Sequence, residues 1–143
     1  MKKVILTMLL IIALSSCGTS KPSGWISGNN NEAGWASVLI SDKVSYDLAF
    51  DDVMGILSRR GFEIEMVTKE AGYIRTKWVH NWNSNGKTFK NYRVRVTVKL
   101  SEQRKRVDIN TEAELLVGKY WIKGHDTELL ETMKQDISGV LGY

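Results

Sequence analysis

The chain has 143 residues, a formal net charge of +4 and one cysteine. This length suits one domain of ordinary size, and a single cysteine excludes a framework of disulfide bonds. Two histidines and one cysteine are too few to predict a zinc site, so we expect no metal ion or other cofactor. Lys2 and Lys3 lie in a segment that we expect to be removed. The remaining 18 basic and 16 acidic residues leave a charge of +2, which is too low to predict binding to nucleic acid.

Residues 1–16 have the three-part layout of a secretory signal peptide. Two lysines are followed by an apolar stretch, residues 4–14, which is interrupted only by one threonine. This stretch is much shorter than the about 20 apolar residues of a transmembrane helix. Small residues then precede Cys17, so we expect cleavage after Ser16.

The end of this segment, Leu14-Ser15-Ser16-Cys17, resembles the lipobox of bacterial lipoproteins. In that class of protein the cysteine is joined to diacylglycerol and its amine is acylated, for example with palmitate. The resemblance implies a membrane partner held through lipid on Cys17, because several acyl chains anchor a protein without a spanning helix. Gly18 stands where lipoproteins retained in the inner membrane of enteric bacteria have Asp, which implies the outer membrane and a domain in the periplasm. The alternative is an unrelated cysteine after an ordinary signal peptide.

Residues 17–34 are dominated by Gly, Ser and Asn and show no apolar period. This composition predicts a flexible tether that carries the lipid. Trp25 in this stretch contacts either the membrane surface or the domain, and the residues leave both readings open. We expect one folded domain over residues 35–143, beginning at Trp35.

The first part of this domain predicts a strand and a helix. Residues 35–40 are short and rich in apolar side chains, as in a strand. From Tyr46 to Leu57 apolar residues recur at helical spacing. Ser45 is the expected N-cap of this helix, and Gly61 is expected to end it.

After Gly61 the apolar period changes to two, which predicts four strands over residues 62–66, 74–78, 92–100 and 107–115. Asn85-Gly86 predicts a tight hairpin turn. A loop bracketed by glycines follows at 118–124, and Asp126 or Thr127 caps a last amphipathic helix.

The order is therefore strand-helix-four strands-helix, and the predicted fold class is α+β: a two-layer domain with an antiparallel sheet and two amphipathic helices on one face. A short turn at residues 101–104 would place Arg93 opposite Glu112. The side chains expected on the buried face are Val94, Val96, Val98, Val107 and Ile109. Those expected on the solvated face are Arg93, Arg95, Asp108 and Glu112.

Three segments carry a resemblance to a known family: Arg60-Gly61-Phe62-Glu63-Ile64, Ala71-Gly72-Tyr73-Ile74-Arg75-Thr76-Lys77-Trp78, and the arginine-rich strand 92–100. In these, the chain from Trp35 onward is similar to the helix-grip domains of the C-subunit lipoprotein of the outer-membrane β-barrel assembly machinery. The resemblance implies a helix-grip fold and a role as an accessory in envelope assembly.

The chain offers little material for catalysis, and we expect no enzyme activity. A His125-Asp126 neighbour pair can orient a general base, but a loop histidine beside a helix cap explains both residues. Asp108, Glu112 and Glu114 line one strand face as a glycosidase pair would, yet arginines of the neighbouring strand pair with them more simply.

Two tryptophans and a basic turn are the candidate binding residues. Trp82 and Trp121 lie near a hairpin tip and in a glycine-bracketed loop, where exposed rings mark an interface; the alternative is that both rings fold back onto the helix edges. Arg104, Lys105 and Arg106 form either a second contact site or a solvated turn. We therefore expect a non-enzymatic binding or assembly-accessory module with an envelope protein partner. The alternative is a carrier that holds a small apolar ligand between helices and sheet, in a cavity of roughly 300 Å³ or more.

Overall fold

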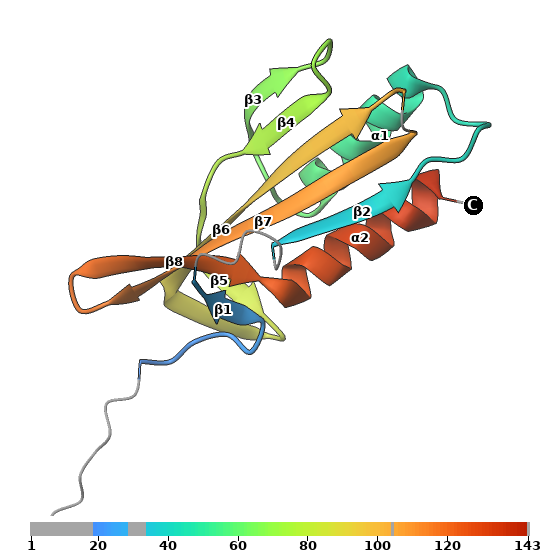
Figure 1. The fold of residues 1–143 in the computed structure, drawn as a ribbon. Coiled ribbons are helices and arrows are strands. Elements are labelled where there is room, and N and C mark those ends of the chain that lie inside the picture. Colours follow the sequence, from blue (N-terminus) through green and yellow to red (C-terminus); the bar gives the residue numbers. More distant parts are fainter. Residues whose placement is uncertain (1–18, 29–33, 104, 143) are drawn as a thin grey trace, which may run out of the picture.

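The computed structural model describes residues 19–28, 34–103 and 105–142. The predicted signal peptide, Ser16 and Cys17 lie outside the described residues, as does Arg104. The described part contains one antiparallel sheet of eight strands and two helices (Figure 1). In chain order the elements are β1 (Trp25–Ser27), β2 (Trp35–Leu39), α1 (Tyr46–Arg59), β3 (Ile64–Thr68), β4 (Tyr73–Thr76), β5 (Val79–Ser84), β6 (Lys87–Ser101), β7 (Arg106–Val117), β8 (Tyr120–Asp126) and α2 (Thr127–Leu141).

The predicted fold class is wrong, because the molecule is dominated by its sheet. Strands hold 48% of the described residues and helices 25%, so this is not a balanced two-layer domain with strand-helix-four strands-helix order. The apolar pattern does not predict β1, β5 and β8. These strands are fixed by main-chain pairing, and their side chains do not alternate between a buried and a solvated face.

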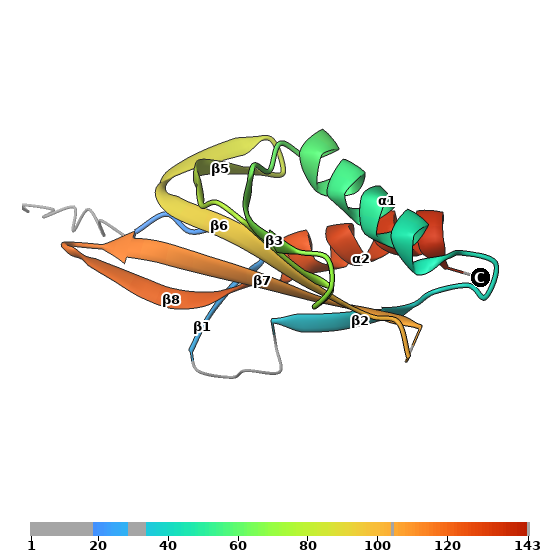
Figure 2. The ribbon, with the colours of Figure 1, turned by 90° about the horizontal axis from the view of Figure 1, so that it is seen from above.

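Strands β6 and β7 form the centre of the sheet. They pair over ten residue positions, from Tyr92 opposite Leu115 to Ser101 opposite Arg106. The sheet order is β1-β8-β7-β6-β4-β3. In addition, β2 pairs with the first half of β7, and β5 pairs with the first half of β6. At one end of the molecule the β5–β6 hairpin and the β7–β8 hairpin separate into a fork (Figure 2).

The register of β6 and β7 differs by two residues from the predicted one. Arg93 lies opposite Glu114, and Arg95 lies opposite Glu112. The two strands are joined between Ser101 and Arg106 by a longer loop than the predicted turn, and Lys105 in it has a φ of +46°. The longer loop shifts every pair by two residues. Because side chains alternate with a period of two, each one stays on its predicted face.

The predicted first helix is confirmed as α1. Ser45 accepts a hydrogen bond at its N-cap. Gly61 has a φ of +83°; its amide donates to the Ser58 carbonyl, and the Phe62 amide donates to the Leu57 carbonyl. A glycine takes this left-handed conformation without the strain that a Cβ would add, so the helix ends there.

The Asn85-Gly86 hairpin is also confirmed. Both residues have positive φ, at +51° and +78°, and Ser84 pairs with Lys87 across them. Two central residues of positive φ match the right-handed twist of the flanking strands.

The two faces of the β6–β7 pair are as predicted. The apolar set shows no exposed area and belongs to one core with both helices, which lie on that side of the sheet (Figure 2). That set is Val94, Val96, Val98, Val107 and Ile109. Arg93, Arg95, Asp108 and Glu112 alternate with it and stay partly exposed. Packed side chains of this core fill the layer between helices and sheet. Protein interiors are ordinarily close-packed in this way.

Part of the segment expected to be a flexible tether is paired with the sheet. Trp25 lies opposite Asp126 and Ile26 opposite His125, which makes β1 the neighbour of β8. Pro22 is buried, and the Trp25 side chain packs against the core. Of the two readings left open for Trp25, contact with the domain is the one found.

Candidate functional site

The face of the sheet that points away from the helices, here called the open face, carries three of the five tryptophans. Its rings are Trp35, Trp78 and Trp121, from β2, the β4–β5 connection and β8. Each ring lies over a cation of β6, and the rings of Trp35 and Trp121 reach it across β7. The solvated face of an antiparallel sheet is ordinarily polar, so this concentration of indole rings distinguishes it.

Arg93 on the open face is held by an ion pair and by two tryptophan rings. Its guanidinium lies between two rings, with its central carbon 4.8 Å from the Trp78 centroid and 4.2 Å from the Trp121 centroid. It also donates two hydrogen bonds to Glu114, whose side chain is only 10% exposed. The ring of His80 meets Trp121 edge-on at 6.3 Å. A paired and stacked guanidinium holds both rings in place.

Arg95 repeats this arrangement one row further along β6. It bonds both oxygens of Glu112, at 2.6 and 2.9 Å, and lies 4.5 Å from the Trp78 centroid. The hydrogen bonds to Glu112 raise the pKa of Arg95 above its ordinary value. Bidentate pairing fixes the plane of the guanidinium, so its orientation is set before any partner arrives.

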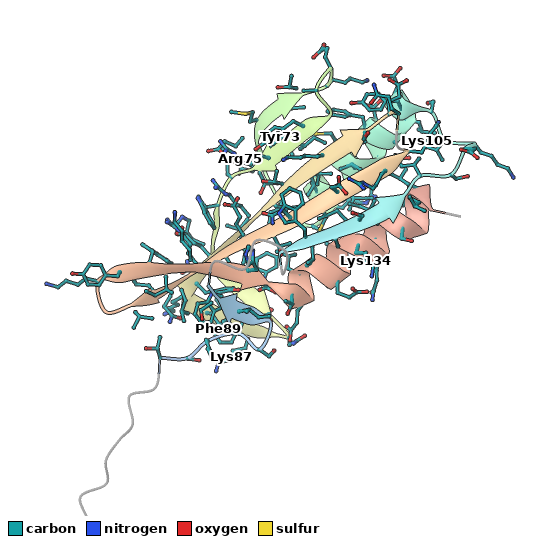
Figure 3. All side chains as sticks on the ribbon, viewed as in Figure 1. Tyr73, Arg75, Lys87, Phe89, Lys105 and Lys134 are labelled. Atoms are coloured by element: carbon teal, nitrogen blue, oxygen red, sulfur yellow. The ribbon has the colours of Figure 1, made fainter. Side chains whose placement is uncertain are left out.

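Trp35 and Lys99 continue the open face toward the β6–β7 loop. The Lys99 ammonium lies 5.0 Å from the Trp35 centroid, and the Trp35 side chain is 39% exposed. On the neighbouring strand β4, Tyr73 lies opposite Lys99 and Arg75 lies opposite Thr97 (Figure 3). Among the described residues Lys99 and Lys123 have no carboxylate within 4 Å of the ammonium, so the face has uncompensated positive charge.

Two adjoining hollows open on this face and share Arg95 and Glu112. The first, of about 210 Å³, is also lined by Trp78, Lys123 and His125. The second, of about 260 Å³, is also lined by Trp35, Tyr73, Arg75 and Lys99. Both combine an indole ring with cations, which suits a partner that offers carboxylates or planar groups.

The structure does not bring the two predicted binding tryptophans together. Trp82 packs against the core on the helix side, with its ring centroid 5.6 Å from that of Phe62. Trp121 lies on the open face over Arg93. In the sequence both tryptophans are near loops. Side chains along a strand point alternately to opposite faces of the sheet, and nearness to a loop does not decide which face a side chain occupies.

The basic turn lies at the other end of the sheet from Trp121 (Figure 3). Arg106 donates to Asp108 at 2.8 Å, and the Lys105 carbonyl accepts from the Ile40 amide. Arg104 lies outside the described residues. The described part of this turn is therefore tied to its own strands and does not form one surface with either tryptophan.

His125 and Asp126 do not form a pair. Their side chains leave opposite faces of β8: His125 Nδ1 lies 3.2 Å from the Thr111 carbonyl, whereas Asp126 is buried under α2. Asp126 is the N-cap of α2, accepting from the Leu129 amide at 2.8 Å, and it accepts from the Tyr92 hydroxyl at 3.0 Å. Burial raises the pKa of Asp126, although both hydrogen bonds act against that rise.

The carboxylates of β7 are occupied by arginines. Asp108, Glu112 and Glu114 each accept from an arginine side chain. In the part of the chain that the structure describes, no cluster of three or more His, Cys, Asp or Glu side chains is placed to hold a metal ion. Neither described helix is long and apolar enough to cross a bilayer.

Comparison with models of known protein families gives no match, and comparison with curated protein sequences gives none either.

Trp35 and Trp78 are the site residues that sequence reasoning does not single out. In the sequence Trp78 continues the alternation of Ile74 and Thr76, which are both buried. The strand ends at Thr76, and Trp78 then lies over Arg93 and Arg95 on the open face. Its place among basic residues is visible in the sequence only once the pairing of β4, β5 and β6 is known.

The raised pKa of Asp126 predicts how stability depends on pH. A carboxyl whose pKa is higher in the folded than in the unfolded state holds its proton more tightly when folded, so stability falls as pH rises through that interval. Asp126→Asn removes the titration and keeps an N-cap acceptor. The free energy of unfolding of the natural chain minus that of the variant should therefore decrease from about pH 4 upward and then level off.

Urea unfolding at a series of pH values measures this difference directly. A difference that is constant with pH, or that grows as pH rises, would show that Asp126 is not held in a proton-favouring site.

Proposed function

We propose that the protein is a lipid-anchored bacterial envelope protein that binds an envelope protein partner, without catalysis, through the open face of its sheet. The anchor is lipid on Cys17, and the location is the periplasmic side of the outer membrane. The observation that carries the binding role is the row of three tryptophans outside the core: Trp78 and Trp121 lie over paired arginines, and Trp35 lies over Lys99.

The composition of the open face supports a protein partner. Trp, Tyr and Arg are the residue types most enriched at the centres of interfaces. Here their side chains are already held by ion pairs and ring contacts, so little side-chain freedom is left to lose on binding. The predicted pair, Trp82 and Trp121, is replaced by Trp35, Trp78 and Trp121, which share the open face.

The anchor rests on the Leu14-Ser15-Ser16-Cys17 ending and its position after a short apolar stretch. Gly18 supports the outer membrane, and the resemblance of residues 60–64 and 71–78 to the assembly-machinery lipoprotein supports a partner in envelope assembly. A carrier that holds a small apolar ligand between helices and sheet has less support, because packed core side chains occupy that layer.

The anchor predicts a simple loss. Cys17→Ala removes the only thiol in the chain, so acyl groups have no attachment point. The variant should lose incorporation of labelled palmitate and leave the membrane fraction, whereas Ser20→Ala should retain both. An unlabelled natural protein in the same bacterium would contradict the anchor.

The binding role predicts capture from one face only. A photocrosslinking residue at position 99, on the open face, should capture a partner in growing cells. The same residue at position 134, exposed on α2, should not (Figure 3). Adding Trp35→Ala should weaken capture from position 99 about fivefold or more, because truncating a central interface aromatic typically costs more than 1 kcal/mol.

Equal capture from both positions, or capture that Trp35→Ala leaves unchanged, would move the binding site away from the open face.

A further inference from the structure

The described N-terminal segment is attached to the fold from Ser20 onward. The Ser20 hydroxyl accepts a hydrogen bond from Lys87 Nζ at 3.0 Å, and the Ser20 carbonyl accepts one from Asn91 Nδ2 at 3.1 Å. Pro22 follows and is buried, and β1 then pairs with β8. The chain therefore joins the sheet much closer to Cys17 than a tether over residues 17–34 would allow.

The remaining length of chain limits how far the fold can lie from its anchor. Only three residue steps separate Cys17 from Ser20, and a fully extended chain spans at most about 11 Å over that length. A lipid on Cys17 consequently keeps the start of β6 within about one headgroup layer of the bilayer, because headgroup regions are several ångströms thick. The fold meets the membrane with the end that holds Ser20.

This end of the molecule is the fork seen in the overall fold. In Figures 1 and 2 the described N-terminal residues lie at the same end as the tip of the β7–β8 hairpin, away from the loop that joins β2 to α1. Asn91, which binds Ser20, precedes Tyr92, and Tyr92 pairs with Leu115 only two residues before the end of β7. We call residues 19–28, 79–91 and 115–125 the membrane-facing end.

The charged side chains within the membrane-facing end are all lysines; Glu128, at the start of α2, borders this end and accepts hydrogen bonds from Ser23, Ser84 and Asn85. Its three segments contain five lysines and no aspartate or glutamate. The lysines are Lys21, Lys87, Lys90, Lys119 and Lys123. A surface of this sign is attracted to the phosphates of anionic phospholipids.

Three exposed apolar side chains of this end gather at the hairpin tip, and a fourth, Ile26, lies on β1. Tyr120 is 75% exposed, and Val117, paired with it across the turn, and Ile122 are exposed as well. These side chains project beyond the helices and contact no core. An aromatic ring flanked by lysines, as in Lys119-Tyr120, is typical of the membrane–water interface.

We propose that the membrane-facing end docks on the anionic phospholipid bilayer that holds the anchor, with the β7–β8 tip in the headgroup region. The inference rests on the proposed lipid at Cys17. The partner is the bilayer itself, because the anchor brings this end to it and the charges match. The open face then starts at Trp121 beside the membrane and runs away from it toward Trp35.

A single thiol at the tip tests the docking. In the lipidated protein Cys17 carries a thioether, so Tyr120→Cys supplies the only free thiol for an environment-sensitive fluorophore. In vesicles of phosphatidylethanolamine and phosphatidylglycerol, the emission at position 120 should shift to the blue and be quenched by lipids that carry a quencher near the headgroup. Asp42→Cys, in the exposed loop before α1, is the control and should report water in the same vesicles.

Removing two lysines of the hairpin is a second test of the docking. Lys119→Gln together with Lys123→Gln should reduce the blue shift at position 120 at least twofold, since the hairpin then loses its attraction to the anionic lipid. A probe at position 120 that stays in water overturns the proposal. A blue shift without lipid quenching also overturns it, because the tip is then covered by protein, such as a second copy.

The mass of the mature N-terminus separates this proposal from the one on which it rests. Acylated Cys17 with position 120 in water refutes docking and leaves the lipoprotein assignment standing. A chain without acyl groups on Cys17 refutes the anchor, and the docking proposal falls with it.

Discussion

The apolar core and the open face of this molecule both depend on the register between β6 and β7. These two strands form the longest pairing in the described chain. Successive side chains along a strand point to opposite faces, so the register fixes the face that each residue occupies. On one side the valines and Ile109 are fully buried against the helices. On the other side Arg93 and Arg95 meet Glu114 and Glu112 directly across the ladder. A slip of one residue would bury the arginines and expose the valines, so the apolar core and the open face specify each other.

The same alternation of side chains explains what the sequence predicts well and what it does not. Where one side of a strand is buried, as in β6 and β7, alternation is visible and the buried set is predicted residue by residue. The caps of α1 and the Asn85-Gly86 turn are likewise predictable, because they are local. Most side chains of β1, β5 and β8 are exposed or half-buried, so no alternation of buried and solvated residues marks these strands. The tryptophan cluster of the open face depends on these strands and on the β4–β5 connection, and it emerges only from the three-dimensional pairing.

The structure also changes the expected relation between domain and membrane. A glycine- and serine-rich segment suggests a long tether, yet Ser20, Pro22 and β1 are fixed to the sheet by hydrogen bonds, burial and pairing. In the proposed docking, the short chain to Cys17, the lysines and the exposed hairpin tip all place the same end at the bilayer. In this account the open face extends outward from the membrane, where Trp35 and Lys99 are accessible to a partner in the periplasm. The register that orders the open face therefore also sets its direction relative to the anchor.

The central claim is that the open face is the working surface of the protein. Hydroxyl-radical footprinting in intact envelopes, compared with the purified lipidated protein, tests this most directly. The account predicts that Trp35 on the open face is oxidised readily in the purified protein and is several-fold protected in envelopes, while Leu48, exposed on α1, is oxidised equally in both. Equal oxidation of Trp35 in the two preparations, or protection of Leu48 instead, would contradict it.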